Sequence, residues 1–454
     1  MDRMGMHDRA DVGSGAVDVA VEPPFRGGHE CTDPMAVLVH FDQLIGRQFA
    51  IRESRRGDEK PRAGAHAHIS CRALIDAGRV HGQCRAEQLV AQRTEVGRVS
   101  AGHRRSIAAV RTVDWVDGAI VIIDQTALPH RFAHLRLEST EAVIDAIQRL
   151  AVRGAPAIGA TGALAVAMLA RNAQRDDKPV ESIRADAERV ALARPTAVNL
   201  RWAIERVLAS IDHGYDAVVA AAVRLMNDDV VTNMLMTNRG ADLVEALCAR
   251  AGARDPASTA ITVHTHCNTG DLATVEGGTA LGVAFRLHER GLLREVIADE
   301  TRPLLQGSRL TAFELAQRAI PYRLSADGAG PTCVARGLVD VVLIGADRVA
   351  ANGDTANKIG SYPLALACHR AGVPFVVVAP ESTIDLSTEN GAAIDIEMRS
   401  EDEVTHLNGV EIAPKGSRAV NFAFDVTPAD LITAIVTEHR VIRPTETARI
   451  SAAL

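Results

Sequence analysis

Short β-branched runs alternate with longer helical patterns between about residues 260 and 378. The strands are expected at 261–265, 295–299, 322–324, 340–344 and 374–378, and the helices at 279–290, 310–319, 330–336 and 357–371. This alternation is typical of an open, mostly parallel sheet with helices on both faces. This alternation restricts the fold more than any other feature of the sequence. Sheets of this kind bind ligands outside the carboxyl ends of their strands.

The region before this alternation is expected to be mainly helical. Two short strands are predicted at 112–115 and 119–124, joined by a turn. Ser139 or Thr140 can cap a helix that stops at Gly154, and the next helix has Pro156 in its first turn. Further helices are predicted at 180–193, 199–213 and 215–250, the last one broken. The apolar stretch at 155–170 is shorter than the roughly 20 residues of a membrane span, so we interpret it as a buried core helix.

Residues 1–105 differ from the rest of the chain, because no hydrophobic period is sustained in them. We interpret them as an irregular, disordered extension or as the product of a mis-assigned start site. The predicted fold class is therefore α/β, with three parts. The extension at 1–105 precedes a smaller, mainly helical domain with short strands at 106–255, and a Rossmann-like domain with a mostly parallel sheet follows at 256–445.

Charge and cysteine usage exclude several classes of function. The 454 residues include 50 Lys plus Arg and 57 Asp plus Glu, so the formal net charge is −7. No global basic field would therefore attract nucleic acid or an anionic membrane. The seven cysteines are scattered without a C-x-x-C pair, which fits a reducing cytosol and argues against a zinc site. We expect a cytoplasmic protein without a metal, a nucleic-acid partner or a membrane partner.

Two loops at predicted strand ends carry reactive side chains. The strand at 261–265 leads into HCNTG, which contains Cys267, and the strand at 340–344 leads into GADR, which contains Asp347. Taken alone, a cysteine is more often an inert buried hydrophobe, and an aspartate is more often a cap or an ion-pair partner. Both loops are nevertheless expected at the ligand-binding edge of one sheet. Their shared position favours a catalytic role for the two residues.

Arg153 and Gly154 come directly before a predicted helix N-terminus, where free N–H groups and the helix dipole bind anions. The alternative is a basic residue in the last turn of one helix, followed by a glycine stop. Arg194 offers a second cation on a turn. The glycine-rich stretch at 275–282 lacks the G-x-G-x-x-G spacing, so no nicotinamide cofactor is expected. We interpret His264 and His266 as facing opposite sides of the strand end, which would prevent them from sharing a metal ion.

Six ordered segments between residues 111 and 443 carry a family resemblance. They are RGAPAIG at 153–159, RPTAVNL at 194–200, HCNTG at 266–270, ETRP at 300–303, QG at 306–307 and GADRVAANGDTANKIG at 345–360. The chain resembles the methylthioribose-1-phosphate isomerases, whose family also contains the regulatory subunits of the eukaryotic translation-initiation guanine-nucleotide exchange factor. Phe422 departs from the family pattern where proline is common, and Asp271 where a small residue is common.

The resemblance implies a catalytic pair, Cys267 and Asp347, with Asp347 as the proton donor. The implied substrate contacts are Arg153, Gly154, Ala155, Arg194, Gln306, Asn357 and Lys358. The implied reaction converts 5-methylthioribose 1-phosphate into 5-methylthioribulose 1-phosphate in methionine salvage. It would be carried out by a cytoplasmic homodimer without a cofactor.

Three alternatives remain open at this point. Isomerases of the same fold could act on 5-deoxyribose 1-phosphate or ribose 1,5-bisphosphate, because the sequence does not show what lines the pocket near C5. A non-catalytic, nucleotide-sensing regulatory subunit is an alternative from another class. The presence of Cys267, Asp347 and the Arg and Lys contacts together argues against that subunit, because a scaffold does not need them.

Overall fold

The computed structural model describes residues 111–194, 197–250, 260–447 and 449–451. All of them belong to one compact unit of the chain. The extension expected at 1–105 lies outside the described residues. The division of the remainder into domains at 106–255 and 256–445 stays a prediction.

A small antiparallel sheet comes first in the described part. Its strands are β1 (Val113–Val116), β2 (Ala119–Ile123) and β3 (His134–Leu137), in that order. Asp117 and Gly118 between β1 and β2 have φ values of 50° and 77°, the left-handed pair that a tight hairpin turn requires. The hairpin was predicted, whereas β3 was not.

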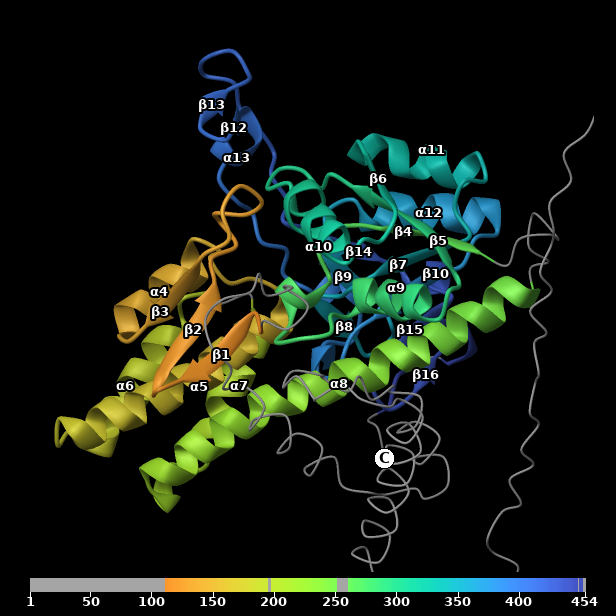
Figure 1. The fold of residues 1–454 in the computed structure, drawn as a ribbon. Coiled ribbons are helices and arrows are strands. Elements are labelled where there is room, and N and C mark those ends of the chain that lie inside the picture. Colours follow the sequence, from red (N-terminus) through yellow and green to blue (C-terminus); the bar gives the residue numbers. More distant parts are fainter. Residues whose placement is uncertain (1–110, 195–196, 251–259, 448, 452–454) are drawn as a thin grey trace, which may run out of the picture. The chain divides into compact units, whose positions relative to one another are not determined.

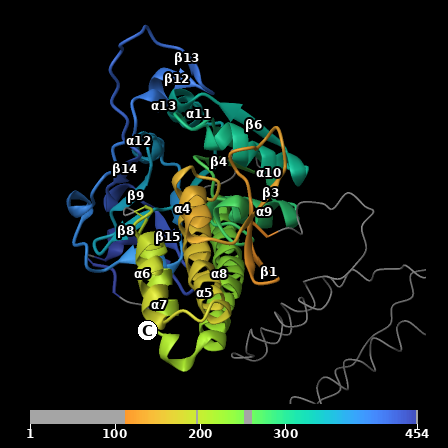
Figure 2. The same cartoon turned by 90° about the vertical axis from the view of Figure 1, so that its left-hand side faces the viewer.

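A group of packed helices follows. They are α4 (Thr140–Gln148), α5 (Ala155–Arg175), α6 (Val180–Ala191), α7 (Val198–Leu208) and α8 (Tyr215–Arg250). Helix α5 packs against α6, α7 and α8 (Figures 1 and 2), and its residues from 157 to 170 are all buried. The prediction of a buried core helix is therefore confirmed. In the described part of the chain, no helix combines the length and apolar character that crossing a bilayer requires.

Helix α8 is continuous over 36 residues, so the predicted break is wrong. Its first half contributes Val218, Ala222 and Met226 to the hydrophobic cluster around α5. Its second half contributes Met236 and Val244 to the cluster under the large sheet. Because the helix changes packing partner along its length (Figure 1), its apolar positions do not follow one uniform stripe, and this made the sequence look interrupted.

The large sheet has seven strands in the order β16-β15-β10-β7-β4-β5-β6. They are β4 (Ile261–Thr265), β5 (Leu293–Asp299), β6 (Tyr322–Ser325), β7 (Val341–Ile344), β10 (Phe375–Val378), β15 (Ala434–Val436) and β16 (Val441–Ile442). Neighbouring strands pair in parallel, except β15 with β16. The flanking helices include α9 (Ala280–Glu289), α10 (Ala312–Gln317), α11 (Gly330–Ala335) and α12 (Ser361–Ala371). The predicted α/β class with a mostly parallel sheet is confirmed.

The strand order reverses between β4 and β7. The chain proceeds outward from β4 through β5 to β6, and then returns to place β7 on the other side of β4. Val263 pairs with Val341 and Thr265 pairs with Leu343, so the two strands end at nearly the same level. Such a switch point opens a crevice at the carboxyl ends of the strands. The loops that contain Cys267 and Asp347 begin at this crevice.

A second sheet has the order β11-β8-β9-β14. Its strands are β8 (Arg348–Ala350), β9 (Thr355–Lys358), β11 (Ile384–Asp385) and β14 (Phe424–Thr427). Residues 357–360 were predicted to begin a helix, and this is wrong because β9 pairs with β14, a strand far along the chain that local periodicity cannot reveal. The helix begins only after Gly360, at φ 108°. Beyond it lie α13 (Asp402–Thr405), β12 (His406–Leu407) and β13 (Val410–Glu411).

Candidate active site

One cavity at the switch point is lined by every site residue expected from the sequence. These residues are Arg153, Gly154, Ala155, Arg194, Cys267, Gln306, Asp347, Asn357 and Lys358. They come from the start of α5, the turn before α7, the loops after β4, β5 and β7, and strand β9. Sequence reasoning therefore identified side chains that the fold brings together, while the role of each stays a proposal.

Cys267 is held in a left-handed backbone conformation, with φ 65°. This conformation costs a non-glycine residue about 1–2 kcal/mol, so neighbouring groups must stabilise it. Its N–H donates to Thr301 Oγ1 at 2.9 Å, and its carbonyl accepts from Thr311 Oγ1 at 2.6 Å. The side chain is 7% exposed, and Arg153 Nη2 lies 3.5 Å from its Sγ. The thiol is therefore fixed beside a guanidinium at the cavity wall.

A buried carboxyl group supports the same loop from behind. Arg153 Nη1 donates to Asn268 Oδ1 at 2.9 Å, and Asn268 Nδ2 donates to Glu314 Oε1 at 2.7 Å. Glu314 also accepts from the N–H groups of Asp271 and Leu272. Burial, together with the charge of Asp271, raises the pKa of Glu314 to about 8. Sequence reasoning missed Glu314, because it looks like one more residue of a predicted amphipathic helix.

The N-terminus of α5 opens onto the cavity. Gly154 precedes the helix with φ 88°, no side chain caps the first turn, and Ala155 and Pro156 line the cavity. The first N–H groups of a helix have no partner inside it. The start of this long helix therefore offers N–H donors and the positive end of its dipole to an anion.

Gly154→Ala is expected to lower the melting temperature and weaken substrate binding together. An alanine Cβ would lie 2.4 Å from the carbonyl oxygen of Ala273, so the start of α5 would have to move. Gly214→Ala is the matched control: Gly214 also has positive φ, at 92°, but its Cβ would meet no atom within 4 Å. The control should show only the backbone cost of about 1–2 kcal/mol. Equal loss of stability in the two variants, with an unchanged Michaelis constant for Gly154→Ala, would contradict a role for the start of α5 in binding the substrate.

Three basic side chains, Arg153, Arg194 and Lys358, surround Asp347. Burial raises the pKa of Asp347, and the three cations oppose this rise. Burial likewise lowers the pKa of Lys358, against the influence of Cys267 and Asp347. Within the described part of the chain, no side-chain hydrogen bond satisfies the carboxyl group of Asp347. A raised pKa increases the protonated fraction, so this carboxyl is suited to donate a proton to a bound molecule.

Arg399 lines the same cavity and was not predicted. Its guanidinium bonds Glu403 and Glu397, and Glu397 Oε2 lies 3.6 Å from Arg194 Nη2. These contacts connect two arginines of the cavity through one carboxylate. Arg399 comes from the irregular segment before α13, where no period or motif marks a site residue.

The interpretation that His264 and His266 face opposite sides is wrong. His264 Nε2 lies 3.1 Å from Asp299 Oδ1, and His266 Nδ1 lies 2.9 Å from Asp299 Oδ2. Residues two positions apart share one face of a strand, because side chains alternate with a period of two. Both histidines therefore meet the same carboxylate at the end of β5.

The initiation factor 2 subunit family matches residues 151–444, which is more than half of the chain. The chain belongs to this family. A protein of Nocardia farcinica, named as a probable bifunctional methylthioribose-1-phosphate isomerase/methylthioribulose-1-phosphate dehydratase, is 52% identical over 335 residues. That match covers 74% of this chain and 59% of the relative, so the chain spans about three-fifths of that protein's length.

Other members of the family match over nearly their whole length. A methylthioribose-1-phosphate isomerase of Thermoanaerobacter is 43% identical over 345 residues, which cover 74% of this chain and 96% of the relative. Among solved structures, a 5-methylthioribose 1-phosphate isomerase from Pyrococcus horikoshii has a TM-score of 0.65 and 37% identity, covering 74% of this chain and 93% of that one. The family resemblance seen in the sequence is therefore confirmed.

Proposed function

We propose that this chain is an aldose–ketose isomerase that converts 5-methylthioribose 1-phosphate into 5-methylthioribulose 1-phosphate. The observation that carries the proposal is that Cys267 and Asp347 line one basic cavity at the switch point of the sheet. Relatives named as isomerases of this substrate, at 43–52% identity, support it. The reaction moves one hydrogen from C2 to C1 and opens the sugar ring, so it needs no external oxidant or reductant.

The 1-phosphate group would bind where positive charge converges. Arg153 provides a guanidinium, the start of α5 provides N–H groups, and Lys358 provides a buried ammonium group that is 5% exposed. Charge-assisted hydrogen bonds from such groups are stronger than neutral ones. The arrangement would orient the anomeric carbon toward Cys267 and Asp347.

Asp347 would begin the reaction as a general acid. Its proton goes to the ring oxygen, the bond from that oxygen to C1 breaks, and the electron pair stays on the oxygen as it becomes a hydroxyl. Hydrogen then moves from C2 to C1, either as a hydride or by proton removal at C2 and return at C1, with Cys267 beside the reacting carbons. In either route the C2 hydroxyl becomes the ketone carbonyl, and the proton that it loses returns to the carboxylate of Asp347. With deuterium at C2, a hydride shift keeps the label in the product, whereas proton exchange with water loses it.

Two amides in the cavity are suited to bind sugar hydroxyl groups. Gln306 is 5% exposed, and its Oε1 has no hydrogen-bond partner among the described residues. Gln306 lines the cavity, and an amide there can both donate to and accept from a sugar hydroxyl group. Asn357 is 3% exposed and donates to Ser361 Oγ at 2.8 Å, which fixes its side chain at the cavity wall.

Arg153→Ala is expected to raise the Michaelis constant about 10- to 100-fold, because a hydrogen bond to a charged group contributes about 1.5–3 kcal/mol. Arg175→Ala is the control, since Arg175 lies in the last turn of the same helix and pairs with Asp176 on the surface. Steady-state kinetics of both variants measure the difference. An unchanged Michaelis constant and turnover for Arg153→Ala would remove Arg153 from the site.

The substituent at C5 is the finer part of the proposal. Apolar side chains of the cavity, including Leu304, Val378 and Phe424, offer a surface to a methylthio group. A phosphate at C5, as in ribose 1,5-bisphosphate, would need cations beyond those at the 1-phosphate, and the two further arginines of the cavity, Arg194 and Arg399, already pair with Glu397. Competition between 5-methylthioribose 1-phosphate, 5-deoxyribose 1-phosphate and ribose 1,5-bisphosphate should give the highest kcat/KM for the first. A higher value for another sugar would replace the substrate and keep the reaction type.

The cellular setting follows from the same proposal. The enzyme would act in methionine salvage, in the cytoplasm and as a homodimer, with a small sugar phosphate as its partner and without a cofactor. A regulatory subunit of the same family would not need the combination of Cys267, Asp347, Arg153 and Lys358 that lines this cavity.

A further inference from the structure

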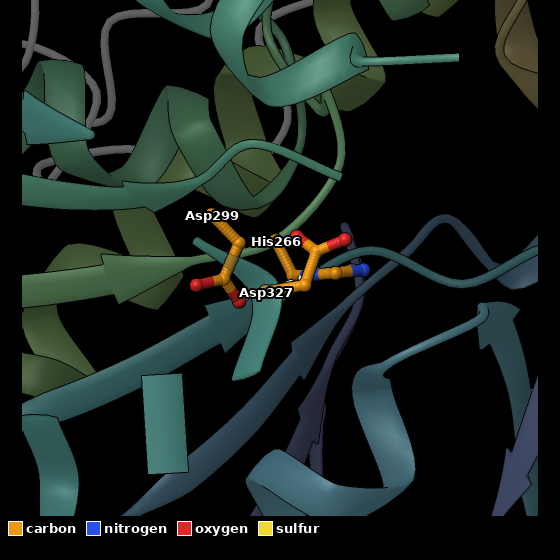
Figure 3. A group of neighbouring side chains, drawn as sticks. All are labelled: His266, Asp299 and Asp327. Atoms are coloured by element: carbon orange, nitrogen blue, oxygen red, sulfur yellow. Dashed lines mark hydrogen bonds and ion pairs between the residues drawn. The ribbon is translucent and has the colours of Figure 1, made fainter. Parts of the chain in front are cut away.

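Three polar side chains meet beside the cavity, at the ends of two strands and a short turn. His266 follows β4, Asp299 ends β5, and Asp327 begins the 3-10 turn Asp327–Ala329 (Figure 3). Asp299 and His266 are each 1% exposed. None of the three side chains has a part in the reaction proposed above.

Both ring nitrogens of His266 face groups that accept hydrogen bonds. Nδ1 lies 2.9 Å from Asp299 Oδ2, and Nε2 lies 2.7 Å from the carbonyl oxygen of Ile359. A backbone carbonyl oxygen can only accept, and an ionised carboxylate can only accept. A neutral imidazole carries a single N–H, so it would leave a lone pair against one of the two oxygens. Only the doubly protonated ring satisfies both.

Asp299 is held in its ionised form by its surroundings. Burial alone would raise its pKa, but hydrogen bonds and charge from His264 and His266 outweigh burial and lower the pKa of Asp299 to about 2. Ser325 Oγ also donates to Asp299 Oδ1 at 2.7 Å. The carboxylate is therefore an acceptor toward His266, and not a donor.

We propose that His266 is a doubly protonated imidazolium that acts as a positioning residue, tying the loop of Cys267 to the strand that carries Lys358. The proposal rests on the isomerase function proposed above. His266 directly precedes Cys267, and Ile359 directly follows Lys358. The two hydrogen bonds of the ring thus connect β5, the thiol loop and the end of β9, and they set the spacing between two side chains that line the cavity.

The backbone around Ile359 is shaped to receive the ring. Gly360 has φ 108°, and a Cβ at this position would lie 2.7 Å from His266 Cε1. Asp425 Oδ2 accepts from the N–H groups of Gly360 and Tyr362 of the same segment at 2.8 and 3.2 Å. The segment after β9 is therefore bonded by both His266 and Asp425, and Gly360 leaves room for the ring.

The charges around the ring favour a cation. Asp299 from β5, Asp327 from the turn after β6 and Asp425 from β14 are the carboxyl groups beside it, and His264 from β4 shares Asp299. An opposite charge within a few ångströms stabilises a cationic ring. The group resembles a metal site in composition, but Asp327 already accepts from the N–H groups of Thr301 and Arg302 at 2.7 and 2.6 Å. These bonds hold the loop after β5.

The protonation state is tested by nitrogen NMR of the full chain labelled with ¹⁵N-histidine, without substrate. The signals of His266 are assigned by their loss in His266→Gln. We expect both ring nitrogens to carry a proton, because each faces a hydrogen-bond acceptor. A spectrum in which one nitrogen of His266 lacks a proton would overturn the proposal, whatever the activity of the protein.

The positioning role is tested by two amide substitutions that separate the two hydrogen bonds. In His266→Asn the amide nitrogen can replace Nδ1 and reach Asp299, whereas in His266→Gln it can replace Nε2 and reach the carbonyl of Ile359. Each should lower kcat about 10- to 100-fold, because a displacement of about 1 Å in a reacting group has an effect of this size. His266→Asn should also raise the Michaelis constant more than His266→Gln does, since it loses the hydrogen bond to Ile359 and so releases the strand of Lys358.

Ser325→Ala is the matched control, because it removes a hydrogen bond from the same carboxylate without touching the ring. It should lower the melting temperature and leave kcat near the wild-type value. If all three variants lose stability while their kcat is unchanged, His266 is only structural and the positioning role is wrong. A wild-type chain without isomerase activity would instead overturn the proposed function, while the NMR spectrum still decides the state of His266.

Discussion

Cys267→Ser is expected to reduce turnover about 100- to 10,000-fold, the usual range for the loss of one acid–base group. The substitution keeps nearly the same shape, but a hydroxyl is a far weaker acid than a thiol and cannot take its place beside the reacting carbons. Because Cys267 is held at φ 65° by Thr301 and Thr311, its backbone position should survive the change. Substrate should therefore still bind and raise the melting temperature.

Cys368→Ser is the control for this experiment. Cys368 is fully buried in α12, and burial raises the pKa of its thiol to about 12, so it is an unreactive cysteine outside the cavity. Its replacement should lower stability by placing a hydroxyl in an apolar core, with little effect on turnover. If folded Cys267→Ser turns over substrate at nearly the wild-type rate, the thiol is structural and its catalytic assignment is wrong.

Asp347→Asn is expected to reduce turnover by about 100-fold or more, because the amide keeps the size of the side chain but has no proton to transfer to the ring oxygen. Binding should largely survive, since Arg153, Arg194 and Lys358 remain in the cavity. If Cys267 and Asp347 act as a unit, the double variant should be little slower than the slower single variant. Additive losses would show that the two residues act in independent steps.

The pH dependence of turnover gives a separate test of Asp347. Burial raises its pKa, so the protonated form persists to a higher pH than for an exposed aspartate. The acid is active when protonated, so turnover should fall as the pH rises through the raised pKa. Asp347→Asn should lose this alkaline decline in its residual activity. If the alkaline decline is unchanged in Asp347→Asn, the decline arises from the titration of another group.

Much of the site could be predicted because its residues follow local signals. Cys267 and Asp347 come directly after short β-branched strands, and the parallel order of those strands brings both to one edge. Ser139 and Pro156 mark helix starts through their own backbone preferences, and the structure places both there. Such signals come from residues that are close together in the sequence, so contacts between distant segments do not change what they predict.

What could not be predicted depends on contacts between distant segments. Strand β9 exists because it pairs with β14, although Asn357 and Lys358 precede a helical pattern. Arg399 reaches the cavity from an irregular segment, and Glu314 supports Asn268 from a helix more than 40 residues away. His264 and His266 are two positions apart, so the strand period of two places both on the face that meets Asp299, contrary to the prediction.

Product identification by phosphorus and proton NMR tests the proposed isomerase function most directly. The purified chain is incubated with 5-methylthioribose 1-phosphate, without added metal or nucleotide, beside the Cys267→Ser and Asp347→Asn variants. We expect the signals of the substrate to be replaced by those of 5-methylthioribulose 1-phosphate with the wild-type chain, and to persist with either variant over the same time. Unchanged substrate with a correctly folded wild-type chain, even if the sugar phosphate binds and raises its melting temperature, would contradict an isomerase function.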